Sequence, residues 1–414
     1  MKILWITNII FPEACSLIGI KPPVMGGWML ACAQSITKSG DIELGVATVY
    51  NGKKLKVIHS KNITYFLLPK SKSNIYYDKS LEKYWISIKE TFCPEVVHIH
   101  GTEYAHGLAY IKSCGAKNVV ISIQGLVSVC ARYYYAGISF WNLFKTYTIR
   151  DLLKGGIIKG KYEFIRRGMI EQEYIKSVNH IIGRTEWDKT HIHAINPNVQ
   201  YHFCNESLRS EFYKHHWKYE SCEKYSIFLS QAGYPIKGLH KVLEAIELVK
   251  LSFPNVKVFI AGPDITKCNS IKEKIKISGY GKYIKYLIKK FDIKENVYFL
   301  GELNETQMLE QYLKANVFIC PSSIENSPNS LGEAQILGVP CIASYVGGIP
   351  DMVPKESCGY LYRFEEIEML AFYICEIFKK TIFNNSEMSN IAKKRHSIDI
   401  NTNQLISIYT KIIK

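Results

Sequence analysis

The chain has 414 residues, of which 47% are apolar and 21% charged, and its formal net charge is +15. Because single hydrophobic cores stop growing well below this length, two domains of about 200 residues each are expected. No run reaches the roughly 18 apolar residues of a membrane-spanning helix, and the composition is that of a globular protein. We therefore expect a soluble chain.

Cysteine usage and the N-terminal residues indicate a compartment. The twelve cysteines include no CxxC pair, which argues against a zinc site and against a disulfide framework. The first apolar run ends at Thr7 and is followed by Pro12, as in a first core strand rather than a signal peptide. Both features favour the cytoplasm. The charge fits nucleic acid, anionic membrane or a phosphorylated substrate, and equally a lysine-rich solvated surface.

In the first half, short apolar runs alternate with helix-length segments. The expected elements are strands at 2–7, 43–49, 95–100 and 118–123, and helices at 28–38 and 103–113. This alternation is typical of a parallel, doubly wound α/β sheet.

Polar residues follow several of these elements at the edge where ligands bind in such sheets. His100 ends the strand at 95–100, and Gln124 follows the strand at 118–123. Of His98 and His100, we expect one to be buried and one to lie in a cleft, and with no third ligand evident we predict no metal site. Gly26-Gly27 precede the helix at 28–38 and form either a backbone platform for sugar or phosphate or a plain turn.

Residues 131–168 interrupt the alternation. The segment carries eight Lys or Arg residues against Asp151 and Glu163, interleaved with aromatic residues such as Tyr135 and Trp141. Cations among aromatic rings are typical of a segment at an anionic membrane surface. An ordinary insertion with a solvated basic face is an equal alternative. Nucleic acid is disfavoured because no nucleic-acid-binding motif accompanies the charge.

The second half repeats the α/β alternation. The expected elements are strands at 225–230, 255–262, 296–301, 317–322 and 340–344, and helices at 239–250, 305–314 and 330–337. Residues 206–224 are polar without apolar periodicity and are expected to form a linker. The sequence thus predicts two Rossmann-like domains, at 1–205 and 225–385, with the basic aromatic segment in the first. Residues 386–414 read as terminal helices, one of which can pack back on the N-terminal domain.

Lys237 and Gly238 stand immediately before the helix expected at 239–250. A cation at a helix N-terminus is electrostatically unfavourable unless an anion joins it. Glycine at this place also lets a diphosphate approach the backbone closely. We interpret the pair as a phosphate site, with a freely solvated lysine as the alternative.

Residues 317–351 combine two carboxylates with a second helix N-terminus. Glu325 lies in a loop after a strand, and Glu333 lies in the first turn of a helix expected to begin near Asn329-Ser330. Such a helix start, at the carboxyl end of a parallel sheet, favours a bound anion. Each carboxylate has a simpler alternative: Ser330-x-x-Glu333 is a capping-box pattern, and Glu325 fits a solvated loop.

Glu325-x7-Glu333 with EAQILGVPCIASYVGGIPDMV, together with YPIKGLHKVLEAI and Gly26-Gly27, resembles the retaining glycosyltransferases of family four. The C-terminal resemblance spans about residues 225–360. It implies the GT-B fold, with two facing Rossmann-like domains and an interdomain cleft. It also implies a nucleotide-sugar bound mainly by the C-terminal domain, an acceptor bound mainly by the N-terminal domain, and no metal or other cofactor.

The resemblance assigns roles at the matching positions. Glu333 would bind the ribose hydroxyls, Glu325 would lie beside the donor sugar, and Lys237 would neutralise the diphosphate. The remaining donor-binding candidates are Gly27, Gly238, Gln231, Asn329, Ser330 and Leu331, and the remaining catalytic candidates are His100 and Gln124.

Two positions depart from the family pattern. Gln231 replaces a common arginine, and Gln124 replaces a frequent histidine. Gln124 can hydrogen-bond a sugar but cannot act as a base. Arg184 is the candidate for a substitute cation at the diphosphate.

The expected activity is transfer of a hexose or N-acetylhexosamine, with retention, from a nucleotide-diphosphate sugar to a saccharide or polyprenyl-diphosphate-linked acceptor. The expected context is surface polysaccharide (capsule or O-antigen) biosynthesis, on the anionic inner face of the plasma membrane and without nucleic acid. A nucleotide-sugar epimerase and a catalytically silent sugar-nucleotide or membrane-binding protein are the alternatives.

Overall fold

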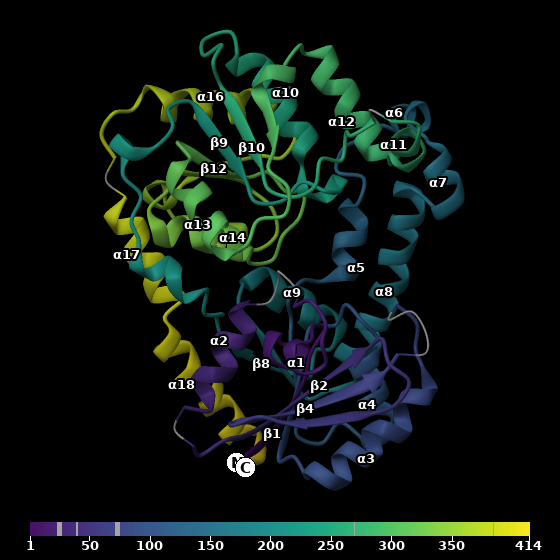
Figure 1. The fold of residues 1–414 in the computed structure, drawn as a ribbon. Helices are drawn as coiled ribbons and strands as arrows, with labels where there is room; N and C mark the ends of the chain where they lie inside the picture. Colours follow the sequence, from purple (N-terminus) through teal and green to yellow (C-terminus); the bar gives the residue numbers. More distant parts are fainter. Residues whose placement is uncertain (23–26, 39, 71–74, 269, 384) are drawn as a thin grey trace. The chain divides into compact units, whose positions relative to one another are not determined.

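The computed structural model describes residues 1–22, 27–38, 40–70, 75–268, 270–383 and 385–414 (Figure 1). The chain divides into two compact units. The first comprises Met1–Cys130, Glu163–Arg209 and His396–Lys414, and the second comprises Ala131–Tyr162 and Ser210–Arg395. Each unit has its own β-sheet and its own hydrophobic core, which confirms the α/β class expected from the alternating pattern.

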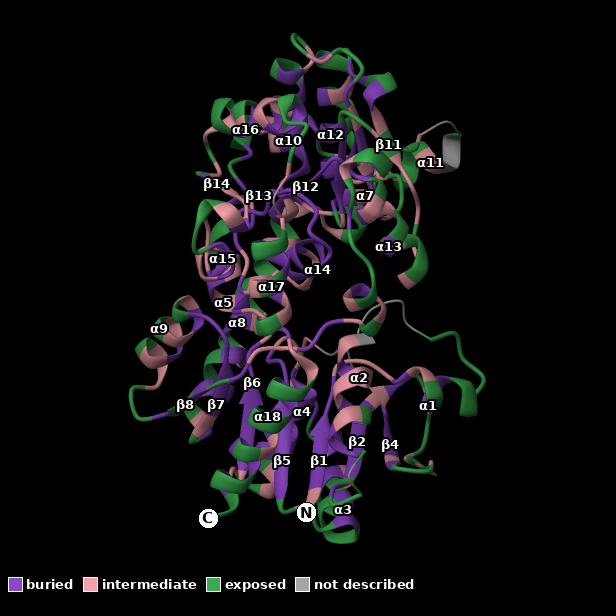
Figure 2. Ribbon diagram, turned by 90° about the vertical axis from the view of Figure 1, so that its left-hand side faces the viewer, coloured by how far each residue is buried: buried purple, intermediate pink, exposed green. Residues whose placement is uncertain are grey.

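The first unit is built on a sheet with the strand order β3-β4-β2-β1-β5-β6-β7-β8 among the described residues. The strands are Lys2–Ile6 (β1), Glu43–Tyr50 (β2), Lys56–His59 (β3), Ile63–Pro69 (β4), Val96–His100 (β5), Val119–Ser122 (β6), His180–Gly183 (β7) and Gln200–Phe203 (β8). Only the edge pair β3 and β4 is antiparallel. The central strands are buried, as Figure 2 shows, because helices cover both faces of a parallel sheet.

The helices of the first unit are Pro12–Leu17 (α1), Gly27–Ile36 (α2), Glu82–Phe92 (α3), His106–Cys114 (α4), Val127–Cys130 (α5), Glu186–Ile195 (α9) and Ile398–Ile413 (α18). The helix Ile157–Ser177 (α8) begins in the second unit and ends in the first, since the division falls after Tyr162.

The second unit has an entirely parallel sheet with the order β11-β10-β9-β12-β13-β14. Its strands are Ser226–Leu229 (β9), Lys257–Ile260 (β10), Val297–Phe299 (β11), Val317–Cys320 (β12), Cys341–Ser344 (β13) and Tyr360–Tyr362 (β14). Within the unit this is the order 3-2-1-4-5-6 of a Rossmann fold. The order reverses between β9 and β12, so the loops that follow these two strands diverge and leave room for a ligand.

The helices of the second unit are Phe140–Lys145 (α6), Ile149–Lys154 (α7), Leu239–Val249 (α10), Ile271–Lys276 (α11), Gly279–Lys290 (α12), Glu305–Lys314 (α13), Asn329–Leu337 (α14), Ile349–Met352 (α15), Ile367–Lys379 (α16) and Ser386–Arg395 (α17).

The structure places most of the basic aromatic segment in the second unit, which differs from the sequence-based division. Ile138 and Leu143 pack into the core of that unit. The Ala136 carbonyl accepts a hydrogen bond from His240 Nε2 at 2.8 Å, and the Tyr133 carbonyl accepts one from Ser323 Oγ at 3.1 Å. These contacts join residues more than 100 positions apart, and periodicity along the chain carries no information about such pairs.

The two terminal helices contact different units. In α18, Thr402 Oγ1 lies 2.9 Å from Ser35 Oγ of α2, and Tyr409 accepts a hydrogen bond from Trp5 Nε1 at 2.9 Å. Helix α17 instead packs on α14, where Ser389 Oγ donates to the Ile336 carbonyl at 2.6 Å. Only α18 therefore packs on the first unit.

Most of the expected linker is packed against the second unit. The Trp217 amide donates to the Leu337 carbonyl at 2.8 Å, and its indole nitrogen donates to the Ala315 carbonyl at 2.7 Å. Phe212 is fully buried. Because this stretch is mostly polar, its sequence did not indicate that Phe212 and Trp217 pack against the second unit.

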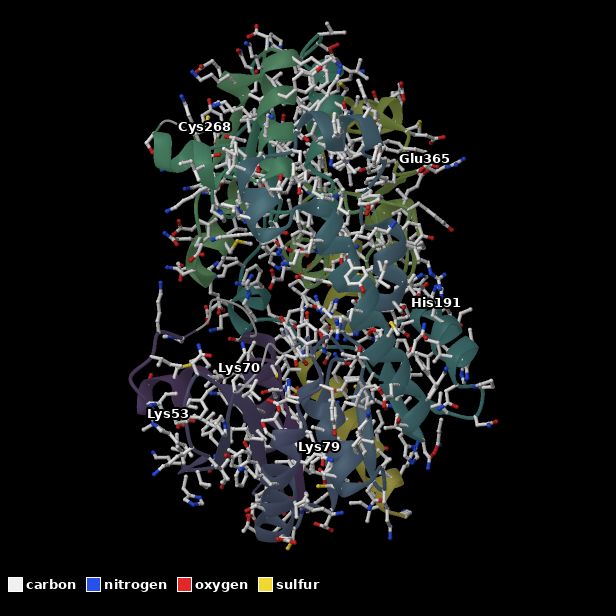
Figure 3. The ribbon with its side chains drawn as sticks, turned by 90° about the vertical axis from the view of Figure 1, so that its right-hand side faces the viewer. Lys53, Lys70, Lys79, His191, Cys268 and Glu365 are labelled. Carbon is white, nitrogen blue, oxygen red and sulfur yellow. The ribbon has the colours of Figure 1, made fainter. Side chains whose placement is uncertain are left out.

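Positive charge is not confined to the basic aromatic segment. Lys53, Lys70 and Lys79 are exposed on the first unit (Figure 3). None of the helices that the structure describes is long and apolar enough to cross a bilayer.

Candidate active site

Lys237 and Glu325 meet where the strand order of the second sheet reverses. Lys237 ends a short 3-10 helix, Pro235–Lys237, in the connection after β9, and Glu325 lies in the loop after β12. Lys237 Nζ donates to Glu325 Oε1 at 2.5 Å, and their side chains are only 18% and 17% exposed. Ser322 Oγ donates to the same carboxylate oxygen at 2.9 Å. Two candidates 88 positions apart thus form one polar centre at the ligand-binding edge of the sheet.

The pair keeps the lysine charged. Burial by itself lowers the pKa of the Lys237 ammonium, but the Glu325 carboxylate outweighs burial and raises that pKa above its ordinary value. The Lys237 ammonium therefore stays protonated at every physiological pH, and the Glu325 carboxylate is its partner at the switch point of the sheet. One interpretation of the sequence, in which Glu325 is a solvated loop acid, is therefore wrong.

The loop after β13 holds the Glu325 loop in place. Gly347 has a φ of +54°, and a Cβ added to it would lie 1.8 Å from the Glu325 carbonyl oxygen. The Gly348 amide donates to that same carbonyl at 3.0 Å, and Ser344 Oγ donates to the Ser322 carbonyl at 2.5 Å. Gly347 lets one backbone pack directly on another, and this contact holds the loop that carries the Glu325 carboxylate.

Close backbone packing also explains why residue 238 is a glycine. Its φ is +71°, and a Cβ added to it would lie 1.8 Å from the Pro321 carbonyl oxygen of the neighbouring loop. From the sequence alone, glycine at this position is expected because it lets a diphosphate come close to the backbone. In the structure, the space that a side chain would take is filled by the backbone after β12.

Gly238→Ala is expected to lower the free energy of unfolding by about 2 kcal/mol or more, because alanine is strained at positive φ and would displace Pro321. Urea denaturation monitored by circular dichroism measures the change. Gly233→Ala is the matched control, since a Cβ there meets nothing within 4 Å. Equal stability of the two variants would contradict the packing explanation.

Glu333 lies deeper in its helix than predicted. Helix α14 begins at Asn329 after Pro328, and no side chain caps it, so Ser330 is inside the helix and the capping-box interpretation is wrong. Glu333 is therefore the fifth helical residue rather than a first-turn residue. It is 6% exposed, on a helix that is buried from Leu331 to Leu337.

The helix start offers fewer amides than expected. The amides of Leu331 and Gly332 both donate to the Pro328 carbonyl, at 3.0 Å and 3.3 Å. Leu331 is therefore not an anion-binding amide in this structure. The Ser330 amide, one residue earlier, has no acceptor within the helix. Gln231, at the position where the family has arginine, is exposed in the loop after β9.

His98 and His100 are both buried, and the expectation that one of them lies in a cleft is wrong. His98 bonds through its two ring nitrogens to Tyr409 Oη at 2.6 Å and Ser122 Oγ at 2.5 Å. The His100 ring packs against His98 and Trp5 in tilted arrangements, with centroids 3.8 Å and 4.4 Å away. Burial, and then the charge of Arg184, lowers the pKa of His100 to about 3, so its imidazole is neutral.

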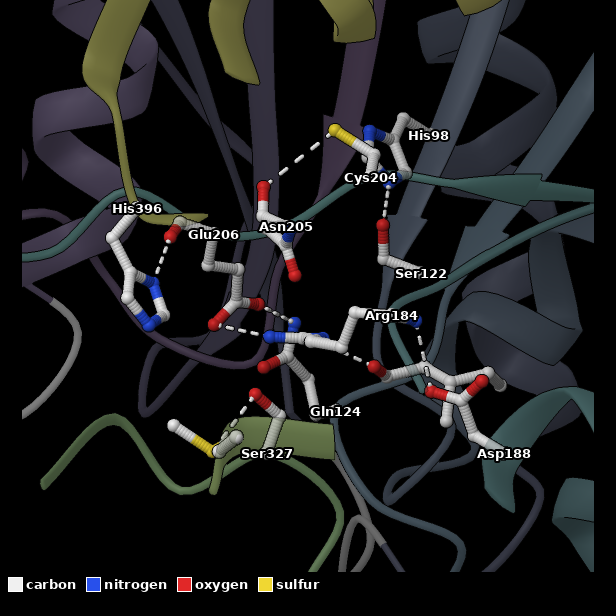
Figure 4. Close-up of polar contacts among 12 residues, drawn as sticks. His98, Ser122, Gln124, Arg184, Asp188, Cys204, Asn205, Glu206, Ser327 and His396 are labelled. Carbon is white, nitrogen blue, oxygen red and sulfur yellow. Dashed lines mark hydrogen bonds and ion pairs between the residues drawn. The ribbon is translucent and has the colours of Figure 1, made fainter. Parts of the chain in front are cut away.

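Gln124 and Arg184 belong to one network in the first unit (Figure 4). Arg184 Nη1 pairs with Glu206 at 2.5 Å, and Gln124 Nε2 donates to the other oxygen of that carboxylate at 2.8 Å. Arg184 is 4% exposed. Its charge is neutralised within the unit, so Arg184 is a poor substitute for the missing arginine. Gly27 begins α2, whereas Gly26 lies outside the described residues.

A polar pair that the sequence did not predict lies at the equivalent point of the first sheet. Its order reverses between β1 and β5, where Asn8 Nδ2 donates to Glu103 Oε2 at 2.9 Å. Burial raises the pKa of the Glu103 carboxyl to about 7, and the charge of Glu171 adds to the shift. In the sequence, Asn8 follows β1 and Glu103 follows β5, and these positions could have indicated the pair. Neither residue belongs to a recognisable motif.

Comparison with known proteins supports a specific family for the second unit. Residues 211–395 match the family described as Glycosyl transferases group 1. Sulfoquinovosyl transferase SQD2 of Arabidopsis thaliana is 29% identical over 134 residues, which are 32% of this chain and 23% of that protein. The chain spans less than half the length of the curated relatives that it matches.

Solved structures resemble the whole chain. Sucrose-phosphate synthase from Thermosynechococcus elongatus has a TM-score of 0.69 at 14% identity, over 100% of this chain and 99% of that one. Anabaena HepE in complex with UDP-glucose has a TM-score of 0.65 at 13% identity, over 99% of this chain and 100% of that one. The chain thus has a two-domain α/β fold that resembles GT-B glycosyltransferases, and its residues 211–395 match the model of the Glycosyl transferases group 1 family.

Proposed function

We propose that this protein is a retaining glycosyltransferase of family four, which transfers a hexose or N-acetylhexosamine from a nucleotide-diphosphate sugar. The observation that carries the proposal is the Lys237–Glu325 centre, which lies at the switch point of a glycosyltransferase group 1 domain. A UDP-hexose is the first donor to test, since HepE is a structural neighbour that binds UDP-glucose.

The reaction breaks the bond between the anomeric carbon and the donor diphosphate. An acceptor hydroxyl attacks from the same face, and its proton passes to the departing phosphate oxygen, so the configuration is retained. The ammonium of Lys237 and the amides at the start of α14 stabilise the negative charge that grows on the leaving group. A protein cation and a helix dipole supply this positive charge, and we therefore propose a metal-independent transfer.

The two glutamates position other groups and do not act as nucleophiles at the anomeric carbon. Glu333 binds the ribose hydroxyls from its buried place on α14. Glu325 orients Lys237 and lies beside the donor sugar. The acceptor, proposed to be a saccharide or a polyprenyl-diphosphate-linked saccharide of a surface polysaccharide, belongs to the first unit, where Asn8, Glu103 and Gln124 lie at the ends of the strands.

A nucleotide-release assay tests this function. The purified chain is incubated with a panel of UDP- and GDP-sugars, with and without lipid-linked saccharides, and released nucleotide and glycosylated product are both measured. Acceptor-dependent release with product of retained configuration is expected. Conversion of the donor to its epimer without release would indicate an epimerase, and donor binding without turnover would indicate a silent binding protein; either outcome overturns the proposal.

A further inference from the structure

The outer sides of α6 and α7, in the second unit, expose large apolar side chains to solvent. Phe140, Trp141 and Phe144 of α6 are 74%, 62% and 68% exposed, and Leu152 and Leu153 of α7 are 73% and 74% exposed. The neighbouring Tyr147, Ile149, Ile158 and Tyr162 are also exposed. Isolated apolar residues are common on protein surfaces, but nine large exposed apolar side chains between Phe140 and Tyr162 indicate a contact surface.

These helices cannot turn inward to bury the exposed residues, because their other sides are already packed. Leu143 of α6 lies in the core of the second unit. Asp151 of α7 is buried and forms a capping box with Thr148. A Cβ added to Gly279 of α12 would lie 2.5 Å from Asp151 Oδ2, so α7 sits directly on that glycine. Helix α6 is therefore apolar on both sides, and such a helix is typically covered by an apolar environment on its outer side as well.

Exposed lysines lie on the same two helices and on the helices packed beside them, and many come from a distant part of the sequence. Helices α11 and α12 lie beside α7 and α6 (Figure 1), and Lys282 Nζ of α12 donates to the Lys145 carbonyl at 3.2 Å. The exposed lysines of these four helices are Lys145, Lys154, Lys274, Lys276, Lys282, Lys285, Lys289 and Lys290. The acidic residues of the same helices, Asp151 and Glu273, both serve in capping boxes.

We propose that this surface, formed by α6, α7, α11 and α12 and here called the basic apolar surface, docks the second unit onto an anionic lipid bilayer. Aromatic and aliphatic side chains enter the interface, while lysines around them bind lipid phosphates. The inference deepens the proposed function and rests on it for its purpose, because a lipid-linked acceptor lies at a membrane.

The charge and the side-chain types favour a bilayer over other partners. Pairing with a second copy would bring two like-charged surfaces together, which is unfavourable. Single-stranded nucleic acid stacks on aromatic rings, but aliphatic side chains such as Leu152 and Leu153 offer no ring on which a base can stack. The Lys145 ammonium lies 5.2 Å from the centre of the Trp141 ring, which places cation and aromatic ring together as a headgroup region requires.

Vesicle sedimentation of the full chain tests the inference. Wild-type protein is expected to bind phosphatidylcholine vesicles that contain phosphatidylglycerol, and to bind weakly when that anionic lipid is absent or salt is high. Trp141→Ser, Phe144→Ser, Leu152→Ser and Leu153→Ser combined are expected to weaken binding at least about tenfold. Lys145→Gln, Lys154→Gln and Lys282→Gln combined are expected to reduce its salt dependence.

Two controls keep the result specific. Leu251→Ser with Phe372→Ser removes exposed apolar residues elsewhere on the second unit and is expected to leave vesicle binding unchanged. Thermal unfolding and UDP binding are measured on every variant, so that failure of docking is distinguished from failure of the proposed function. The inference is overturned if wild type does not bind anionic vesicles at low salt. It is equally overturned if the serine variant binds as wild type does, or if that variant merely dissociates a dimer.

Discussion

Replacing Lys237 with alanine is expected to lower sugar transfer at least about tenfold, because a preorganised positive charge at a leaving group strongly stabilises the transition state. The loss is expected mainly in kcat, since the charge on the diphosphate grows as the bond breaks. Steady-state kinetics with the donor identified by nucleotide release measures the effect. Lys241→Ala is the matched control: Lys241 pairs with Glu244 in α10 at 3.1 Å and its side chain is 15% exposed, so a similar ion pair is lost in the first turn of the next helix while the Lys237–Glu325 pair is kept.

The same substitution also affects stability, and the two effects can be separated. Removing Lys237 leaves the Glu325 carboxylate partly buried without its main partner, which costs about 1–3 kcal/mol of unfolding free energy. Combining Lys237→Ala with Glu325→Gln removes the unpaired charge and is expected to restore much of the stability without restoring transfer. Recovery of transfer in the double variant would show that Lys237 acts only by supporting the fold.

Glu333→Ala is also expected to lower transfer at least about tenfold, through weaker donor binding, because a carboxylate that accepts ribose hydroxyls forms charge-assisted hydrogen bonds. The effect is expected chiefly in the KM for the donor, with a parallel loss of UDP affinity in calorimetry. Glu333→Gln keeps the shape of the side chain but removes its charge, and an intermediate effect is expected.

Gln335→Ala serves as the control for helix α14. Gln335 is equally buried, but its side chain donates to the carbonyls of Met352 and Cys358, both at 3.0 Å, and so supports a neighbouring loop. Its loss is expected to lower stability more than donor affinity. Near wild-type turnover in both Lys237→Ala and Glu333→Ala would refute the assignment of the site.

Local patterns predicted the elements around the site well. The apolar runs at 225–230 and 317–322 contain β9 and β12, and the helices expected after them are α10 and α14. Burial on both sides of a parallel sheet requires such runs, so they are visible in one sequence. The same reasoning misplaced Glu333 within α14, because Ser330-x-x-Glu333 satisfies the capping-box pattern without lying at the helix end.

The first unit was harder to interpret from local pattern alone. His100 ends a strand at the ligand-binding edge, yet α18, from the opposite end of the chain, bonds its neighbour His98 through Tyr409. Glu103 lies three residues later and is the polar group that meets Asn8 across the reversal of the sheet. Which polar residue at a strand end faces a ligand depends on what packs over it, and that is a long-range property.

The sequence by itself determined the α/β class, the presence of two units and the elements that carry Lys237 and Glu325, because periodicity and helix boundaries are local properties. Only the tertiary structure decided that Lys237 and Glu325 form an ion pair, and that Gly238 and Gly347 make room for neighbouring backbones. It also decided that residues 131–162 join α11 and α12 in the second unit. The physical reason is shared: these contacts join residues far apart in the chain, and sheet order and core packing bring them together.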